Sequence, residues 1–230
     1  MQRQIDTMFT GIIEAVGSIV EKQARGGDMR LRIATGKLDL ADVKLGDSVA
    51  TNGVCLTVTG LEGQSFWADV SNETLAHSTL MTLAVGSAVN LEKAMAANGR
   101  FGGHIVSGHV DGVGRVVSLA DDGRSIRIEI EAPADIQRYI AHKGSITVDG
   151  VSLTANALTA AGFLLNIVPH TVAETVIANY QPGTAVNLEV DVIARYLERL
   201  LQAGNDTAQT KPANTSKIDA AFLAEHGFYK

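Results

Sequence analysis

The sequence predicts an all-β protein made of two tandem barrels of similar fold, followed by a C-terminal α-helix. Three observations lead to this fold class. The chain carries an internal repeat at a constant offset of 97 residues, each copy is rich in short β-like segments, and the hydrophobic spacing becomes helical after the second copy. Because this period is too long for a solenoid, we expect two domains of one fold.

The repeat aligns residues 10–92 with residues 107–189 without a gap, and 22 of the 83 aligned pairs are identical. Its longest matches are Asn-Gly-Val-Cys-Leu-Thr at 52–57 with Asp-Gly-Val-Ser-Leu-Thr at 149–154, and Gly-Ser-Ala-Val-Asn-Leu-Glu at 86–92 with Gly-Thr-Ala-Val-Asn-Leu-Glu at 183–189. A match of this length at one offset indicates duplication of a single module.

Within each copy, segments rich in Val, Ile and Thr alternate with Gly, Asn and Asp clusters, which is typical of a small closed barrel. In the first copy the predicted strands are 17–20, 29–33, 48–51, 55–59 and 65–70, and in the second they are 113–117, 126–130, 146–148, 153–156 and 163–168.

Helical signals are fewer. Pro169 suits the first turn of a short helix, where residues 171–174 match a capping box, and a second short helix is expected at about 133–142. After the second copy, Val190, Ile193, Leu197 and Leu200 recur at helical spacing, which predicts an amphipathic helix over 190–204 that ends near Gly204. This helix packs either on its own barrel or between subunits. The small, polar residues after it predict a flexible tail at 205–230.

Composition excludes several classes of protein. Apolar residues make up 46% of the chain, and 25 acidic against 19 basic residues give a net charge of −6, so no basic surface for nucleic acid is expected. No apolar run approaches the roughly 18 residues that a membrane span needs. The single cysteine rules out an intrachain disulfide and fits a reducing compartment. We therefore expect a soluble, cytoplasmic protein.

The sequence lacks the motifs of phosphate loops, dinucleotide sites, nucleophile elbows and zincins. The nearest candidate for a metal site is the pair His104 and His109, but an offset of five places the two side chains on opposite faces of a strand. No metal and no cofactor are expected.

The informative positions are those where the two copies match in register but differ in chemistry. Cys55 aligns with Ser152, each two residues before a threonine, and Ile12 aligns with His109, so that only the second copy has an imidazole there. Residues 69–74 align with residues 166–171, where a strand end runs into a helix start that could bind polar groups. Purely structural roles stay open for each of these positions. Cys55 could be a small buried strand residue, His109 a structural histidine, and residues 69–74 a helix cap.

Taken together, the motifs resemble a known family. Met-Phe-Thr-Gly-Ile-Ile-Glu at 8–14, the matched segments 52–57 and 149–154, and Gly-Gly-His-Ile-Val-Ser-Gly-His at 102–109 resemble riboflavin synthase of the alpha-chain type, over residues 8–201. The resemblance implies two six-stranded Greek-key barrels, at 8–97 and 98–189, and a helix at 190–204 that assembles a homotrimer. Whether the protein also associates with lumazine synthase is left open.

The resemblance further implies a reaction without metal or cofactor. Two molecules of 6,7-dimethyl-8-ribityllumazine react by transfer of a four-carbon unit to give riboflavin and 5-amino-6-(D-ribitylamino)uracil. The reacting pair is expected between the N-terminal barrel of one subunit and the C-terminal barrel of its neighbour.

The residues implied for this site form two groups and a set of roles. One ligand should contact Gly11, Ile12, Ile13, Ser152, Leu153, Thr154, Asn166, Ile167, Val168, Pro169, His170 and Thr171. The other should contact Cys55, Leu56, Thr57, Asp69, Val70, Ser71, Asn72, Glu73, Thr74, Gly108, His109, Val110 and Lys143. His104 is counted with the binding residues.

For catalysis, we expect His109 and Ser152 to remove a proton from the donor's C7 methyl group, and Thr154 to steady the carbanion. Cys55, or a water beside it, would add to the acceptor ring, and Phe9 would pack over the stacked rings. The family usually begins at the position of Met8, so residues 1–7 are additional here.

Three other classes compete with this interpretation. Lumazine proteins keep both barrels and bind a lumazine or flavin without chemistry, but here the reactive residues are present in both copies. A flavin-dependent reductase would need a nucleotide-binding domain for which the repeat leaves no chain. A purely structural trimer would not explain the matched polar motifs.

Overall fold

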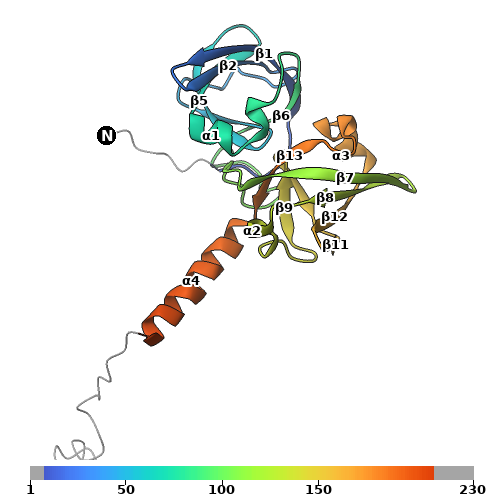
Figure 1. The fold of residues 1–230 in the computed structure, drawn as a ribbon. Helices are drawn as coiled ribbons and strands as arrows, with labels where there is room; N and C mark the ends of the chain where they lie inside the picture. Colours follow the sequence, from blue (N-terminus) through green and yellow to red (C-terminus); the bar gives the residue numbers. More distant parts are fainter. Residues whose placement is uncertain (1–7, 210–230) are drawn as a thin grey trace, which may run out of the picture. The chain divides into compact units, whose positions relative to one another are not determined.

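The first copy of the repeat folds as a closed barrel in the structure, a computed structural model that describes residues 8–209. Its strands follow the order β1-β2-β5-β4-β3-β6 around the barrel, and Figure 1 labels β1, β2, β5 and β6 of this ring. They are β1 (Ala15–Arg25), β2 (Asp28–Ala34), β3 (Ser48–Thr51), β4 (Val54–Leu61), β5 (Ser65–Val70) and β6 (Ala88–Lys93). The five predicted strands are all present, and β6 adds the sixth that the resemblance implied.

The second copy forms a barrel-like sheet in the order β10-β9-β13-β7-β8-β12-β11. Its strands are β7 (Gly112–Asp122), β8 (Ser125–Glu131), β9 (Ser145–Val148), β10 (Val151–Thr154), β11 (Ala157–Leu158), β12 (Gly162–Ile167) and β13 (Ala185–Val190). The expected number of six strands needs correction, because the counterpart of β4 is split into β10 and β11 at Ala155 and Asn156. Beside the break, the Asn156 N–H still donates to the Leu164 carbonyl at 2.8 Å. The all-β class with two tandem barrels is confirmed.

Each barrel has its own hydrophobic core, produced by inward-facing side chains that alternate along the strands. In β1 the burial alternates strictly over its first five residues, and Ile19, Leu31 and Phe66 are fully buried in the first barrel. In the second barrel Ile130 and Phe163, the latter aligned with Phe66, are fully buried. The duplicated pattern of apolar residues therefore builds two equivalent cores.

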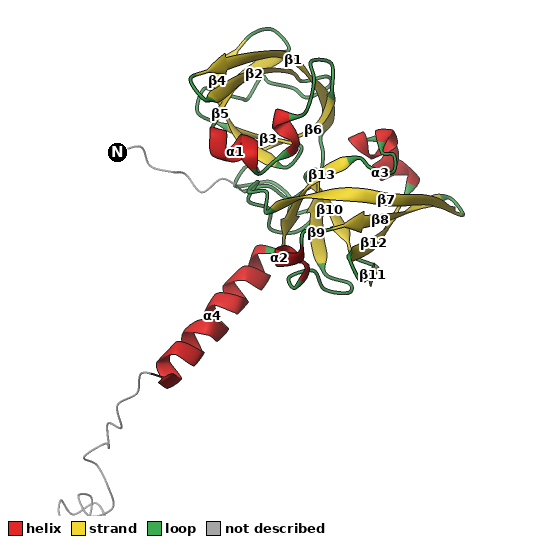
Figure 2. Cartoon of the chain, viewed as in Figure 1, coloured by secondary structure: helices red, strands yellow, loops and turns green. Residues whose placement is uncertain are grey.

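Short helices lie between the strands of each copy along the chain. These are α1 (Asn72–Ala76), the 3₁₀ helix η1 (Thr79–Met81), α2 (Ala134–Gln137), α3 (Pro169–Ala173) and the 3₁₀ helix η2 (Val176–Asn179). Figure 2 shows α1 beside the first barrel and α3 beside the second. The helix start at Pro169 is confirmed, but the capping box at 171–174 is wrong, because Val168 is the N-cap and Thr171 lies inside the helix. The helix expected at 133–142 is shorter than predicted.

The C-terminal helix α4 (Val192–Gln209) is longer than the sequence indicated. It passes through Gly204, where the end was predicted, so residues 205–209 of the expected tail are helical. A glycine inside a helix costs only about 1 kcal/mol relative to alanine and does not by itself end the helix. The remaining part of the expected tail, and residues 1–7, lie outside the described residues. Within 8–209, no helix has the length and apolar character of a membrane span.

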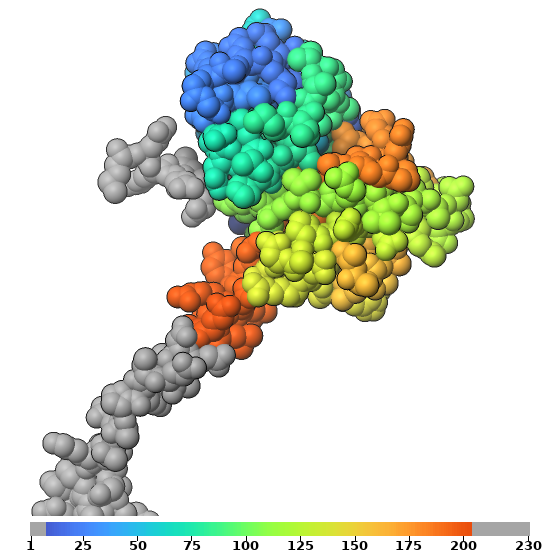
Figure 3. All heavy atoms as spheres, in the orientation of Figure 1, coloured from blue at the N-terminus to red at the C-terminus, as the bar shows by residue number. Residues whose placement is uncertain are grey.

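The two barrels are joined by a buried hydrogen-bond network with matched members in each copy. Asn90 donates to the Asp149 carbonyl at 2.9 Å and accepts from the Val176 N–H at 2.8 Å. Asn187, one repeat later, donates to the Asn52 carbonyl and accepts from the Thr79 N–H, both at 2.8 Å. The atoms of both copies lie in direct contact on the face drawn in Figure 3. The copies therefore pack with an approximate twofold relation.

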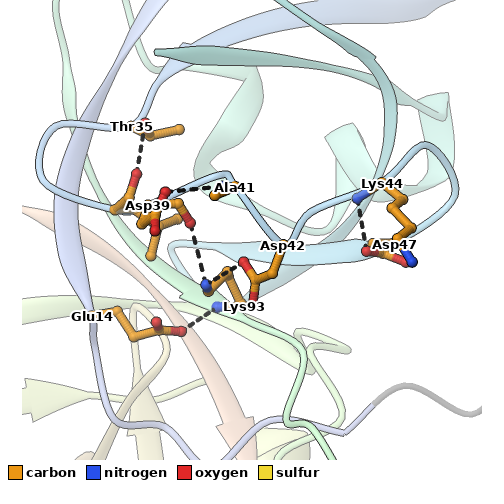
Figure 4. A network of polar contacts seen from close by, with 9 residues as sticks. Glu14, Thr35, Asp39, Ala41, Asp42, Lys44, Asp47 and Lys93 are labelled. Atoms are coloured by element: carbon orange, nitrogen blue, oxygen red, sulfur yellow. Dashed lines mark hydrogen bonds and ion pairs between the residues drawn. The ribbon is translucent and has the colours of Figure 1, made fainter. Parts of the chain in front are cut away.

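The long connection from β2 to β3 in the first barrel is held by hydrogen bonds to Lys93 at the end of β6 (Figure 4). The Lys93 ammonium donates to an Asp42 carboxylate oxygen at 2.7 Å and to the Asp39 carbonyl at 3.2 Å. The Lys93 backbone N–H donates to Glu14 at 2.7 Å. In the second copy, Val190 stands at the position of this lysine. Only the contact between the backbone N–H of this position and a carboxylate is therefore repeated. The network fixes the strand that also carries Glu92.

Candidate functional site

A cavity of about 340 Å³ opens beside Cys55 and is lined by residues of both copies. The first copy contributes the start of β4 and the region around α1, and the second contributes the segment before β7. Its lining residues are Val54, Cys55, Glu73, Thr74, His77, Ser78, Gly108, His109 and Val110. Six of these nine were predicted as members of one ligand group, which supports a binding site at this position.

The two copies meet in this cavity through a close backbone contact. The Cys55 N–H donates to the Gly108 carbonyl at 2.9 Å. Gly108 has a φ of +76°, and a Cβ added there would lie 2.6 Å from the Cys55 Cβ. Only glycine therefore allows the segment carrying His109 to approach Cys55 so closely.

The environment of Cys55 keeps its thiol protonated. Burial raises the pKa of this thiol, the negative charge of Glu189 adds to the rise, and a hydrogen bond with Ser48 opposes it. A neutral thiol is a weak nucleophile but a competent proton donor. Addition of Cys55 to a ligand ring would therefore require that its proton be removed in the same step.

The same arrangement recurs around Ser152 with the copies exchanged. The Ser152 N–H donates to the Gly11 carbonyl at 2.8 Å. Gly11 also has a φ of +76°, and its added Cβ would lie 2.6 Å from the Ser152 Cβ. Each copy therefore holds a reactive side chain on the strand after its first hairpin, and the other copy supplies the glycine that packs against it.

Ser152 is paired with a histidine that the sequence assigned only to binding. Its hydroxyl lies 2.7 Å from the Nδ1 atom of His104, whose backbone N–H donates to the Thr10 carbonyl at 3.2 Å. Burial lowers the pKa of His104, and the charge of Asp191 partly opposes this effect. His104 is therefore neutral at pH 7, and its buried Nε2 atom has no hydrogen-bond partner within residues 8–209. This pair can accept and pass on a proton.

The structure separates the predicted pair His109 and Ser152 within one chain. His109 lines the cavity of Cys55, whereas Ser152 lies against Gly11 and His104. Lys143, predicted with the group of Cys55, lies in the turn before β9 of the second copy, where its N–H donates to the Ala155 carbonyl at 2.7 Å. Within one chain, His109 therefore lies beside Cys55 as predicted, whereas Lys143 does not line that cavity.

Phe9 lies deeper than expected. Its side chain is fully buried in a small cluster with Ala50 and Val106, packed against Cys55. It therefore supports Cys55 from inside the fold, and its packing over a ligand ring stays a prediction.

The remaining predicted residues lie on equivalent elements. Thr57 is on β4 and Thr154 on β10, while the ends of β5 and β12 lead into α1 and α3. Ser71 caps α1 by accepting from the Thr74 N–H at 3.2 Å, so part of this segment has the capping role that was left open. Ile12 and Val168 are exposed.

Sequence reasoning missed several residues at these positions. His77 and Ser78 line the cavity, and the carboxylates of Glu92 and Glu189 bind the segments that carry Gly11 and Gly108. Glu92 and Glu189 are one repeat apart and identical, so the alignment of the copies could have singled them out. Among the described residues, no three His, Cys, Asp or Glu side chains are grouped as a metal site would require.

The model of the lumazine binding domain matches twice, at residues 10–94 and 107–191. The chain belongs to the riboflavin synthase family. It is 54% identical to riboflavin synthase of Photobacterium phosphoreum, over 96% of this chain and 99% of that protein. Identity to riboflavin synthase of Bacillus subtilis is 44%, over 96% and 100%.

A solved structure shares the fold. The crystal structure of LumP complexed with 6,7-dimethyl-8-(1'-D-ribityl) lumazine is similar at a TM-score of 0.72 and 26% identity, covering 80% of this chain and 99% of that chain.

Proposed function

We propose that the protein is a transferase that converts two molecules of 6,7-dimethyl-8-ribityllumazine into riboflavin and 5-amino-6-(D-ribitylamino)uracil. Near-full-length identity of 44–54% to riboflavin synthases supports this activity. The structural observation that carries it is the reciprocal pair of sites, one at Cys55 and one at Ser152. A reaction between two identical molecules in opposite roles needs two similar sites with different reactive groups.

The chemistry balances without another reactant. The donor gives up a four-carbon unit, which consists of two ring carbons with their methyl groups. The two ring nitrogens that lose these carbons become the amino and ribitylamino groups of the uracil product. The acceptor incorporates that unit as the new ring carbons of riboflavin. No net oxidant, reductant or water enters the equation, so the protein needs only to bind, orient and move protons. Orientation of two reactants can itself lower a barrier by about 7–11 kcal/mol.

We assign the proton transfers to the residues described above. His109 and Ser152 remove the proton from the donor's C7 methyl group, with Thr154 and neighbouring backbone groups stabilising the carbanion. Because His109 and Ser152 lie in different sites of one chain, their joint action requires two copies, whereas His104 supports Ser152 within the chain. Cys55, or a water beside it, adds to the acceptor ring.

The proposed assembly is a homotrimer in which the site of one barrel faces the opposite barrel of a neighbour. Exposed apolar residues on α4, among them Tyr196, Leu197 and Leu200, support a role of this helix in assembly. Lys143 would then reach the ligand held by Cys55 from a second copy. The domain limits 8–97 and 98–189, the cytoplasmic location and an association with lumazine synthase stay predictions.

Turnover of the lumazine tests the proposal. The purified full chain is mixed with 6,7-dimethyl-8-ribityllumazine without added metal or cofactor, and riboflavin is followed by absorbance and chromatography. We expect one riboflavin for every two lumazines consumed. Binding of the lumazine without turnover would favour a carrier of the LumP kind and overturn the proposed activity.

A further inference from the structure

Glu92, near the end of β6, has a buried side chain that binds the segment preceding the first barrel. One carboxylate oxygen accepts from the Thr10 N–H at 2.7 Å and from the Thr10 hydroxyl at 3.0 Å. The other oxygen accepts from the Gly11 N–H at 3.0 Å. The side chain is only 5% exposed. Three hydrogen bonds from one short segment to one buried carboxylate hold that segment in a single position.

Glu189, at the same position of β13, binds the segment preceding the second barrel in the same way. One oxygen accepts from the Ser107 N–H and hydroxyl, both at 2.7 Å, and the other accepts from the Gly108 N–H at 3.0 Å. This side chain is 3% exposed. The repeated geometry shows that the contact belongs to the duplicated module.

Each bound segment contacts a reactive residue of the opposite copy. The carbonyl of Gly11, whose N–H is held by Glu92, accepts from the Ser152 N–H. The carbonyl of Gly108, whose N–H is held by Glu189, accepts from the Cys55 N–H, and His109 follows directly in the chain. Each carboxylate thus lies one peptide group away from a site in the other barrel.

We propose that Glu92 and Glu189 are positioning residues for the proposed reaction, in which Glu189 holds Gly108 and His109 against Cys55 and Glu92 holds Thr10 and Gly11 against Ser152. The inference rests on the proposed function and deepens it. Neither carboxylate touches the reacting atoms in this arrangement, and each acts through the glycine segment that it binds.

A carboxylate suits this role better than an amide of equal size. Glutamine has only one acceptor oxygen, and its NH₂ group would face a backbone N–H where the second carboxylate oxygen now accepts. Replacement by glutamine keeps the volume of the side chain but leaves one backbone donor of the segment unpaired. The segment can then move away from the residue that it contacts in the opposite copy, Ser152 for Gly11 and Cys55 for Gly108. This movement misplaces the reactive group.

The experiment compares Glu189→Gln, Glu92→Gln and the matched control Glu14→Gln in the full chain. Glu14 also accepts from a backbone N–H, that of Lys93, but its side chain is exposed and holds neither glycine segment. The kinetic readouts are kcat and KM with 6,7-dimethyl-8-ribityllumazine. We expect kcat to fall about 100-fold in both test variants, as for a reactive group misplaced by about 1 Å, with KM changed much less. Glu14→Gln keeps the parent kcat.

A second readout does not depend on activity. The rate of Cys55 alkylation by iodoacetamide is measured against pH, which reports on the ionisation of the only cysteine in the chain. The charged and titratable groups around this thiol are Glu189 from β13, Glu73 and His77 from α1 and its end, and His109. The midpoint of the profile moves to lower pH in Glu189→Gln through loss of the Glu189 charge alone, so the test is the limiting rate at high pH, where the thiol is ionised in every variant. We expect this limiting rate to rise in Glu189→Gln, because the segment at Gly108 no longer covers Cys55, and to stay unchanged in Glu92→Gln and Glu14→Gln.

Defined results overturn the inference. Parent-like kcat in either glutamine variant contradicts positioning by that carboxylate. An equal rise of the limiting alkylation rate in both test variants indicates general loosening of the fold. If the parent does not turn over, the proposed function fails, and the limiting alkylation rates still decide whether Glu189 holds the segment beside Cys55. Should Glu189→Gln fail to fold, Ser107→Ala removes one of the three hydrogen bonds without removing the charge and is expected to give a smaller rise of the limiting rate.

Discussion

Cys55 and Ser152 occupy the same position in the two copies, yet their surroundings prepare them for different chemistry. Burial and the charge of Glu189 keep the thiol of Cys55 protonated, whereas the hydroxyl of Ser152 is hydrogen-bonded to a neutral His104. The alignment of the copies predicted both reactive residues. It did not predict that His104 is the partner of Ser152, because this contact joins residues 48 positions apart in the chain.

Replacement of the serine tests the assigned proton transfer. Ser152→Ala removes the hydroxyl that His104 contacts, and we expect kcat to fall about 100-fold, a typical loss for one group in general acid–base catalysis. The measurement is steady-state riboflavin formation. Ser118→Ala, on an exposed position of β7, serves as the control and keeps the parent rate. Activity of Ser152→Ala within a few-fold of the parent would contradict the assignment.

Glu189 gives the protein a defined pH dependence of stability. Burial, with a smaller effect of the charge on Asp111, raises the pKa of Glu189 from 4.5 to about 7. The folded state therefore binds a proton more tightly than the unfolded state, so this stabilisation is present below pH 4.5 and is lost as the pH rises through about 7. This part of the stability is greatest where the side chain is protonated, and the hydrogen bonds from Ser107 and Gly108 oppose the rise in pKa because they favour the carboxylate.

We expect the contribution of Glu189 to the free energy of unfolding to fall by about 3 kcal/mol from pH 4.5 to pH 8, at about 1.4 kcal/mol per pKa unit. Urea denaturation at both pH values measures the difference. In Glu189→Gln this part of the pH dependence disappears, while Glu14→Gln keeps it. An unchanged difference in Glu189→Gln would show that burial does not raise this pKa.

Two tight hairpin turns, between β3 and β4 and between β9 and β10, bring the barrels into contact. Both central residues of each turn have positive φ angles, 46° and 76° at Asn52 and Gly53 and 46° and 79° at Asp149 and Gly150. Such turns match the twist of adjacent strands, and their Asn-Gly and Asp-Gly sequences are the usual signal for them. The turn type was therefore predictable, but the packing of one turn on the other was not.

Two glycine substitutions measure separately the cost of backbone strain and the cost of disturbing the close contact between the turns. A Cβ added at Gly150 would lie 2.7 Å from the Gly53 nitrogen, whereas one added at Gly123, which also has a positive φ, has no atom within 4 Å. Gly123→Ala should cost about 1–2 kcal/mol through the backbone alone. We expect Gly150→Ala to cost about 2 kcal/mol more, because the barrels must also shift. Chemical denaturation measures both, and equal costs would contradict a tight contact between the turns.

The interface between the barrels depends on polar groups that are fully enclosed. Asn90 and Asn187 are each about 1% exposed, and each binds two backbone groups of the opposite copy. Buried polar groups stabilise only when they are paired, so loss of one asparagine leaves backbone donors and acceptors unsatisfied. This network lies within the one compact unit that the two copies form.

Asn187→Ala tests the network. It leaves the Asn52 carbonyl and the Thr79 N–H without their present partner, and we expect the free energy of unfolding to fall by about 2–4 kcal/mol. Asn179→Ala, on an exposed residue of η2, should change it by less than about 0.5 kcal/mol. Chemical denaturation provides both values. A loss in Asn187→Ala no larger than in the control would show that water replaces the side chain at no cost.

Assembly is tested by the double substitution Leu197→Glu and Leu200→Glu on the exposed apolar face of α4. If this face joins subunits, sedimentation should show the proposed trimer replaced by monomer, with loss of turnover, because burying carboxylates at an interface is unfavourable. Arg199→Ala is the control and should sediment like the parent. A trimer that survives the double substitution would place the subunit contact elsewhere.

The internal repeat, read from the sequence, determined the two-barrel fold, the equivalence of Cys55 and Ser152, and the short hairpin turns, because these depend on local patterns and on matched positions. Only the tertiary structure decided which residues meet: Gly108 with Cys55, Gly11 with Ser152, and His104 with Ser152. It also decided the split of the strand at Ala155 and the continuation of α4 to Gln209. The physical reason is that each site combines segments far apart in the chain, whose distances are set by packing between the copies and leave no local pattern.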